Sequence, residues 1–136
     1  MRLWHTKLIS AIPNIHLQAQ WREISAIVGA IQKNGTPNHV LVNFVLNYDY
    51  DHLISYAYYV REEMTKRGIR TMNSVWEKII SLKPNYTILP LNEVYKEKMD
   101  KLYLKICYYN LYEKYMCGMF NDIISINEVI KKEGID

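Results

Sequence analysis

Apolar residues recur at spacings of three and four along most of the chain, whereas alternating apolar and polar runs are short. This spacing is typical of helices that bury one face in a common core. The first helix is expected to begin at Pro13-Asn14, with Asn14 as its cap, and to run to about Lys33. The segment Asn34-Gly35-Thr36-Pro37 then ends it. Its expected core stripe consists of Leu17, Ile24, Ile27, Val28 and Ile31.

A second helix is expected from Asp49 or Asp51 to Arg67, because Gly68 can adopt the left-handed conformation that ends helices. Its core face would consist of Leu53, Ala57, Val60 and Met64. Between the first two helices, the segment His39 to Phe44 contains β-branched and apolar residues but has no obvious strand partner. We expect it to be a loop or a short buried extended piece.

Three more helices are expected in the second half of the chain. A short one covers residues 73–82 and stops before Pro84, and Pro90-Leu91-Asn92 begins a long one. The core seam of this long helix is expected to consist of Tyr95, Met99, Leu102, Ile106 and Tyr109. A last helix covers residues 121–132 and ends before Gly134. The pattern therefore predicts an all-α fold with about four to five helices.

Length and composition are those of one compact domain covering residues 1–136. A hydrophobic content of 49% is enough for one core without disulfides or a structural metal. Cys107 and Cys117 have neither disulfide-framework nor metal-ligand spacing, and the four histidines are scattered, so we expect no metal and no cofactor. No signal peptide or membrane-spanning run is recognisable, and a reducing cytoplasm is the expected location.

The net charge of +3 is concentrated at one end of the chain. Residues 1–33 contain Arg2, Lys7, Arg22 and Lys33 against the single acid Glu23, which gives 4 − 1 = +3, and the remainder is balanced. If the protein binds a polyanion, the N-terminal end should contact it. A basic excess of this size is also compatible with solubility alone.

Three polar side chains fall on one edge of the first expected helix. At about 100° per residue, His16, Gln20 and Glu23 lie within roughly 60° of one another beside the apolar stripe. An acid next to apolar surface tends to have a raised pKa and can donate a proton or stabilise positive charge. The alternative is a structural role for Glu23, as a partner of backbone groups or an arginine, and for His16.

Glycine-rich phosphate loops, a nucleophile elbow and a Cys-His pair are not recognisable in the sequence. The twelve tyrosines are unusual, and several of them lie near Lys105 and Lys114: Tyr108, Tyr109, Tyr112 and Tyr115. Aromatic residues interleaved with lysines can stack on bases and hold phosphates. Tyrosines in such a helix are also common as core residues whose hydroxyl stays in water.

The first helix reads H-L-x-A-x-x-R-E-x-x-x-x-x-G-A from His16 to Ala30 and resembles the phage-type pyrimidine-dimer DNA glycosylases. The opening M-R-L-W-H resembles the bacterial proteins grouped with that family. The block E-E-M-T-K-R-G-I, residues 62–69, is similar to the end of a family helix. The stretch Tyr112-Glu113-Lys114-Tyr115 is a looser similarity, and the resemblance is strongest over roughly the first 70 residues.

The resemblance implies a DNA repair glycosylase with AP-lyase activity on UV-induced pyrimidine dimers or on other damaged or abasic sites. In this family the terminal α-amine attacks C1′ of the damaged nucleotide and forms an imine that undergoes β-elimination. Met1 would supply the amine and Glu23 the acid. An α-amine is much less basic than a lysine side chain and is partly unprotonated near neutral pH.

The resemblance also implies a DNA-binding cleft at the N-terminal end. Arg2 and Arg22 match basic positions near the family's site and would hold phosphates, and His16 would position the DNA backbone. Lys33 and Lys114 are further candidates for DNA contacts.

The chain departs from the family pattern at two places. The phage-type enzymes use a threonine exposed by methionine removal, but Arg2 is too large for ordinary methionine removal, so Met1 would remain. Ala26 and Val28 stand where family members carry an arginine, which would weaken or alter DNA affinity or the preference for dimers. We expect a monomer on duplex DNA. The alternatives are a non-catalytic helical DNA-binding or interaction protein, and an interaction module with an exposed apolar seam from Tyr95 to Tyr109.

Overall fold

The computed structural model describes residues 1–135, and every regular secondary-structure element in this part of the chain is a helix. It confirms the all-α class. The α-helices are α1 (Asn14–Asn34), α2 (Asp51–Lys66), α3 (Asn73–Ile80), α4 (Lys101–Met116) and α5 (Ile124–Lys132). Three short 3-10 helices accompany them: η1 (Thr6–Leu8), η2 (Asn43–Asn47) and η3 (Leu91–Glu93).

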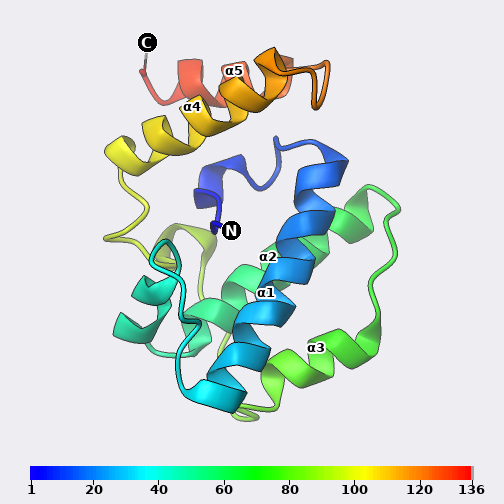
Figure 1. The fold of residues 1–136 in the computed structure, drawn as a ribbon, viewed down its shortest axis with the longest axis vertical. Helices are drawn as coiled ribbons and strands as arrows, with labels where there is room; N and C mark the ends of the chain where they lie inside the picture. The colour runs from blue at the N-terminus through cyan, green and yellow to red at the C-terminus, as the bar shows by residue number, and fades with distance from the viewer. Residues whose placement is uncertain (136) are drawn as a thin grey trace.

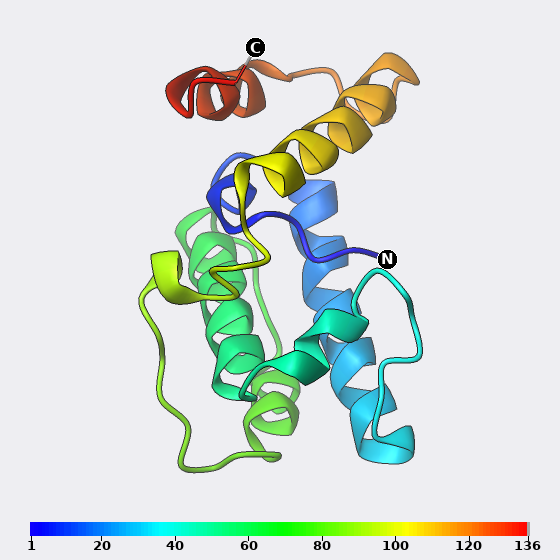
Figure 2. The same cartoon turned by 90° about the vertical axis from the view of Figure 1, so that its left-hand side faces the viewer.

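The helices form two groups with the N-terminal segment between them. α1 packs against α2 and α3 in one group, and α4 and α5 lie at the end of the molecule furthest from α3 (Figure 1). Residues 1–12 run between α4 and the α1–α2 pair (Figure 2). This segment is part of the core, because Leu3 and Leu8 are completely buried and Ile12 is almost completely buried.

The first two helices follow the predicted pattern. The expected stripe of α1 is buried except for Ile31, which packs against the core from a half-buried position, and the expected face of α2 is buried throughout. Gly35 ends α1 in the left-handed region, at φ 75°, and its N–H donates to the Ile31 carbonyl at 2.8 Å. The predicted cap is wrong, because Pro13 occupies the cap position and Asn14 is the first helical residue.

The loop between α1 and α2 is not extended. Residues 43–47 form the 3-10 helix η2, in which Val45 is buried. The neighbouring Val42 is also buried, and Val40 is 85% exposed. The apolar pattern of this segment therefore arises because Val42 and Val45 are buried within a turn, and it does not indicate a strand.

The predicted long helix after Pro90 is wrong at its start. Pro90 begins only the short 3-10 helix η3, and α4 does not begin until Lys101, where the Asp100 carboxylate caps it by accepting from the Tyr103 N–H at 2.8 Å. Between them Tyr95 lies in the left-handed region at φ 50° with its ring fully buried. Because its ring is buried in the core, Tyr95 keeps a backbone conformation that residues other than glycine rarely adopt.

The predicted seam of α4 is also wrong. The residues of α4 that face the core are Tyr103, Leu104, Cys107 and Leu111. Leu102 is 66% exposed and Tyr109 57% exposed, so the part of the expected seam that lies on α4 faces outward. Tyr95 of that seam is buried as predicted, but it precedes α4. α3 and α5 are shorter than predicted, because α3 ends at Ile80 and α5 begins at Ile124. None of the helices within residues 1–135 is long and apolar enough to cross a membrane.

Candidate functional site

The N-terminal segment is fixed to α1 by one buried side chain, Gln20, which is 1% exposed. The Gln20 Oε1 atom accepts from the Trp4 N–H at 2.8 Å, and its Nε2 atom donates to the Arg2 carbonyl at 2.9 Å. Since a backbone N–H can only donate, this contact fixes which end of the amide is oxygen. The side-chain amide therefore bonds both a backbone N–H and a backbone carbonyl of the segment, as the backbone of a neighbouring β-strand would.

Two tyrosine hydroxyls complete the attachment from α2 and α4. The Tyr56 hydroxyl lies 2.6 Å from the Trp4 carbonyl oxygen and 2.8 Å from Gln20 Oε1, so its single proton faces two acceptors. The Tyr103 hydroxyl donates to the Leu3 carbonyl. Because these groups pair with the carbonyls of residues 2–4 and with the Trp4 N–H, an extended segment can run through the core with most of its backbone polar groups bonded.

The end of this segment opens into a cavity of about 360 Å³ beside α1. Its walls come from the N-terminal segment, the first three turns of α1, the loop before η2, and the end of α4 with the residues that follow it. The lining residues are Met1, Arg2, Trp4, Ile15, His16, Ala19, Arg22, Glu23, Leu41, Asn110, Lys114 and Met119. Of the seven residues predicted for the site, six line this one cavity.

Glu23 lies half-buried in the wall of the cavity, with its Oε2 atom accepting from Gln20 Nε2 at 3.0 Å. Burial raises the pKa of Glu23 above its ordinary value. The charge of the N-terminal amine and the backbone N–H of Arg2 act in the opposite direction. Met1 and Arg2 line the same cavity as the carboxylate. The raised pKa agrees with the expectation drawn from the position of Glu23 at the edge of the apolar stripe.

His16 is buried among aromatic rings and is 7% exposed. Its ring makes edge contacts with Trp4 and Phe120, at centroid distances of 6.3 and 5.5 Å. Burial, and then the charge of Lys114, lower the pKa of His16, so the ring is neutral at physiological pH. The Nε2 atom of this neutral ring has no hydrogen-bond partner in the described part of the chain.

The basic residues that line the cavity differ in how exposed they are. Arg22 is exposed at the rim and Lys114 is half-buried in the α4 wall. Arg2 is half-buried, with its guanidinium 5.8 Å from the centre of the Tyr103 ring. With the Met1 amine protonated, the formal charge of the cavity is 4 − 1 = +3, since Glu23 is the only acid that lines it. Such a cavity attracts anions.

Lys33 is the predicted site residue that the structure does not bring to this cavity. It is exposed in the last turn of α1, ten residues after Glu23 and therefore about 15 Å further along the helix. A role for Lys33 in DNA contacts stays a prediction.

Sequence reasoning did not identify Tyr56, Tyr103, Asn110 or Trp4 as parts of the site. Gln20 was placed beside Glu23 by helical spacing, but its bonds to the N-terminal segment were not foreseen. Tyr56 and Tyr103 act on backbone groups 52 and 100 residues away in the chain, and nothing in the local pattern of either residue signals this.

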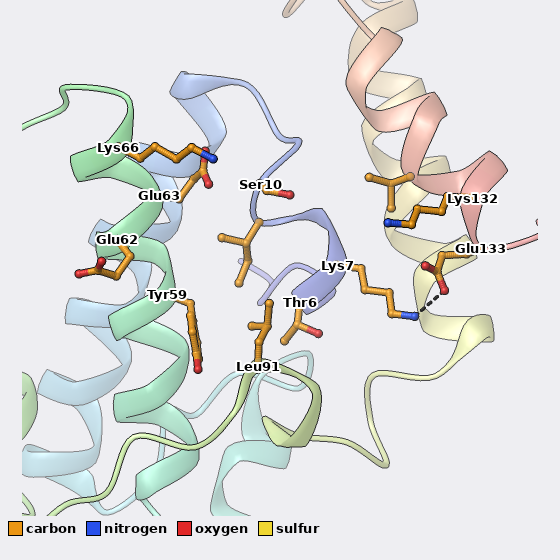
Figure 3. Close-up of a pocket in the computed structure, with 12 residues that line it drawn as sticks. Thr6, Lys7, Ser10, Tyr59, Glu62, Glu63, Lys66, Leu91, Lys132 and Glu133 are labelled. Atoms are coloured by element: carbon orange, nitrogen blue, oxygen red, sulfur yellow. Dashed lines mark hydrogen bonds and ion pairs between the residues drawn. The ribbon is translucent and has the colours of Figure 1, made fainter.

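A larger hollow of about 550 Å³ lies between η1, α2 and α5 (Figure 3). None of the predicted site residues lines it. Two of its three acids are engaged in ion pairs, Glu133 with Lys7 and Glu63 with Arg67. We therefore place the candidate site in the smaller cavity, where the only acid has a raised pKa and lies near an amine.

A family model described as pyrimidine dimer DNA glycosylase matches residues 1–77, which is more than half of the chain. The chain therefore belongs to the pyrimidine dimer DNA glycosylase family. The match covers the N-terminal segment, α1, α2 and the first part of α3, and so includes every wall of the cavity except the part formed by α4 and the residues after it. No curated protein and no solved structure is significantly similar to the chain.

Proposed function

We propose that this protein is a DNA glycosylase with AP-lyase activity that uses the α-amine of Met1 and the carboxyl group of Glu23. The observation that carries the proposal is that the N-terminal residue and an acid with a raised pKa line one basic cavity. Membership in the family supports damaged duplex DNA as the substrate, with pyrimidine dimers as the leading lesion.

The proposed reaction begins when the lone pair of the Met1 nitrogen attacks C1′ of the damaged nucleotide. The N-glycosidic bond breaks and its electron pair leaves with the base, which takes up a proton. The nitrogen loses one proton, and its lone pair then forms the C1′=N bond while the C1′–O4′ bond breaks. The sugar ring opens, O4′ takes up a proton, and a protonated imine results. Loss of the C2′ proton then expels the 3′-phosphate by β-elimination, and water hydrolyses the imine and regenerates the amine.

Glu23 is proposed to act at two points of this sequence. Its carboxylate stabilises the positive charge that develops at C1′ and on the imine nitrogen. Because its pKa is raised, it can also accept the C2′ proton and release it at near-neutral pH.

The remaining lining residues are proposed to hold DNA. Arg22 at the rim and Lys114 in the α4 wall contact phosphates, and Arg2 supports the strand next to the amine. The buried His16 ring is proposed to shape the wall of the cavity that positions the DNA backbone. The target nucleotide must leave the base stack to reach C1′, and a cavity of about 360 Å³ has the size range of small-ligand sites.

Borohydride trapping of the purified, tag-free protein tests this proposal. Three duplexes are compared: one with a cyclobutane dimer, one with an abasic site and one undamaged. The expected result is a covalent adduct on the abasic and dimer duplexes that peptide mapping assigns to Met1. Glu23→Gln should abolish the adduct or slow its formation. Glu62→Gln, the same exchange at an exposed position of α2 outside the cavity, is the matched control and should keep the adduct.

Absence of an adduct on both damaged duplexes, from protein that is folded and binds DNA, would refute the lyase proposal. That result would favour a non-catalytic helical DNA-binding protein on the same scaffold. An adduct on the abasic duplex alone would retain the lyase and remove intact dimers from the substrates.

A further inference from the structure

α4 exposes a row of large apolar side chains on its outer face. Leu102, Ile106, Tyr109 and Met116 are 66%, 39%, 57% and 65% exposed. At about 100° per residue they lie within roughly 80° of one another around the helix. We call these four residues the outer stripe. Tyr112, 41% exposed, lies beside them. Scattered apolar residues are common on protein surfaces, but a row of four large apolar side chains on one face of a helix indicates an interaction surface.

The outer stripe is arranged symmetrically about Tyr109. Leu102 and Met116 lie seven residues before and after it, and Lys105 and Glu113 lie four residues before and after it. Both charged residues are exposed, and neither takes part in an ion pair within residues 1–135. Apolar side chains thus lie at both ends of the stripe. A positive and a negative side chain flank its centre at equal distances along the helix.

We propose that the outer stripe binds the outer stripe of a second copy of this chain, with the two α4 helices antiparallel. A two-fold axis at Tyr109 then pairs Leu102 of each copy with Met116 of the other. The same axis pairs each Lys105 with the Glu113 of the other copy. A two-fold contact of this kind requires a self-complementary surface, and this stripe meets that requirement in both its apolar and its charged positions.

The composition of the stripe favours a second copy over DNA. Three of its four members have no hydrogen-bonding group for a base or phosphate, and the Glu113 carboxylate would repel the phosphate backbone. The cavity residues of α4 lie on another side of the helix: Asn110 and Lys114 are about 100° and 140° from Tyr109. The dimer therefore leaves both cavities open, and the inference is independent of the proposed chemistry.

The expected association is weak. The contact is a single helix pair, α4 has 16 residues, and such a contact buries roughly 1,200 Å² or less, at the low end of specific interfaces. We therefore expect a dissociation constant in the micromolar range. The proposal differs from the monomer expected from the sequence, which stays a prediction.

Sedimentation equilibrium of the tag-free protein, from about 1 to 200 µM, tests the proposal. The wild type is expected to shift from monomer to dimer over this range. In a dimer of either single variant, Lys105→Glu or Glu113→Lys, residue 105 of each copy and residue 113 of the other carry the same charge. Each substitution should therefore raise the dissociation constant about tenfold. Glu128→Lys, an equally exposed charge reversal on α5, is the control and should leave it unchanged.

The decisive sample is an equimolar mixture of the Lys105→Glu and Glu113→Lys variants. In a mixed dimer both charge pairs are again opposite in sign, so association should return to nearly the wild-type strength. Since every substitution is on an exposed side chain, circular dichroism should show unchanged helix content.

A wild type that stays monomeric up to the highest concentration, or a mixture that associates no better than its components, would overturn the proposal. A monomeric wild type whose DNA affinity falls on Leu102→Ser would assign the stripe to DNA instead. Loss of dimerisation has no bearing on borohydride trapping, so the two proposals fail separately.

Discussion

The side-chain nitrogen of Gln20 lies 3.0 Å from the Glu23 carboxylate and 2.9 Å from the Arg2 carbonyl, and donates to both. One amide group thus sets the spacing between the acid of the proposed site and the backbone next to Met1. The other end of the same amide is held by Trp4 and Tyr56. Gln20 is therefore a positioning residue for the proposed reaction.

Gln20→Ala is expected to reduce the single-turnover rate of strand cleavage at an abasic site by about 10- to 100-fold, because small displacements of reacting groups are costly. Gln20→Glu keeps the acceptor for the Trp4 N–H but places a second carboxyl group beside Glu23. This like charge should raise the pKa of Glu23 further and shift the acidic limb of the pH–rate profile to higher pH.

Gln18→Ala, at an exposed position on the same helix, is the control for both variants. A Gln20→Glu profile that superimposes on that of the wild type would show that Gln20 serves the fold but does not influence Glu23.

Glu23→Gln is expected to raise the melting temperature at pH 7 by about 1–3 °C. The raised pKa of Glu23 in the folded state means that the fold binds its proton more tightly than the unfolded chain does. The protonated Glu23 carboxyl therefore stabilises the fold. This stabilisation is fully present below the pKa that Glu23 has in the unfolded chain, and it is lost as the pH rises through the pKa that Glu23 has in the folded protein. The melting curves of variant and wild type should therefore converge below about pH 4.

Thermal melts between about pH 3 and pH 8 measure this difference, with Glu62→Gln on the exposed side of α2 as the control. A Glu23→Gln variant that is less stable than the wild type at pH 7 would mean that the ionised carboxylate stabilises the fold.

Arg67→Lys is expected to lower the free energy of unfolding by about 1–3 kcal/mol. The Arg67 guanidinium donates to the Ile12 carbonyl at 2.7 Å, the Ser10 carbonyl at 3.1 Å and the Glu63 carboxylate at 2.8 Å. It joins the end of α2 to the turn before α1, and a lysine ammonium cannot reach these acceptors in the same forked geometry. Urea denaturation measures the loss, and Arg70→Lys, at an exposed position, should change it little.

Asp100→Ala is expected to lower the free energy of unfolding by about 1 kcal/mol, because it removes the cap of α4. Asp100→Ser, which retains an acceptor for the Tyr103 N–H, should recover most of the loss. Equal destabilisation by the two substitutions, measured by urea denaturation, would indicate that the charge of Asp100 matters more than its hydrogen bond.

The first two helices were predictable because their apolar residues fall on one face and glycines end them at Gly35 and Gly68. α4 was not, since its apolar residues are spread around the whole helix and periodicity alone cannot select the buried face. The start of α4 was misjudged for a different reason. The Pro90-Leu91-Asn92 signal is real but produces a single 3-10 turn, after which the burial of Tyr95 in a left-handed conformation redirects the chain.

The site was predictable where it lies on one helix. His16, Gln20 and Glu23 share an edge of α1 by spacing alone, and the family resemblance adds Met1 and Arg2. The attachment of the N-terminal segment was not predictable, because it depends on hydroxyl groups from α2 and α4 that meet backbone atoms near Trp4 only in the folded chain.

The bond between Tyr103 and Leu3 joins residues 100 positions apart, and this separation affects the order in which the protein is assembled. At about 5–20 residues per second, a ribosome adds Tyr103 roughly 5–20 s after Leu3. Gln20 and Tyr56 emerge in that interval and can hold the opening residues loosely against α1 and α2. Until α4 is synthesised and released, however, the buried side chains of this segment remain uncovered on one side. The cavity next to Met1 is therefore among the last parts of the nascent protein to become complete.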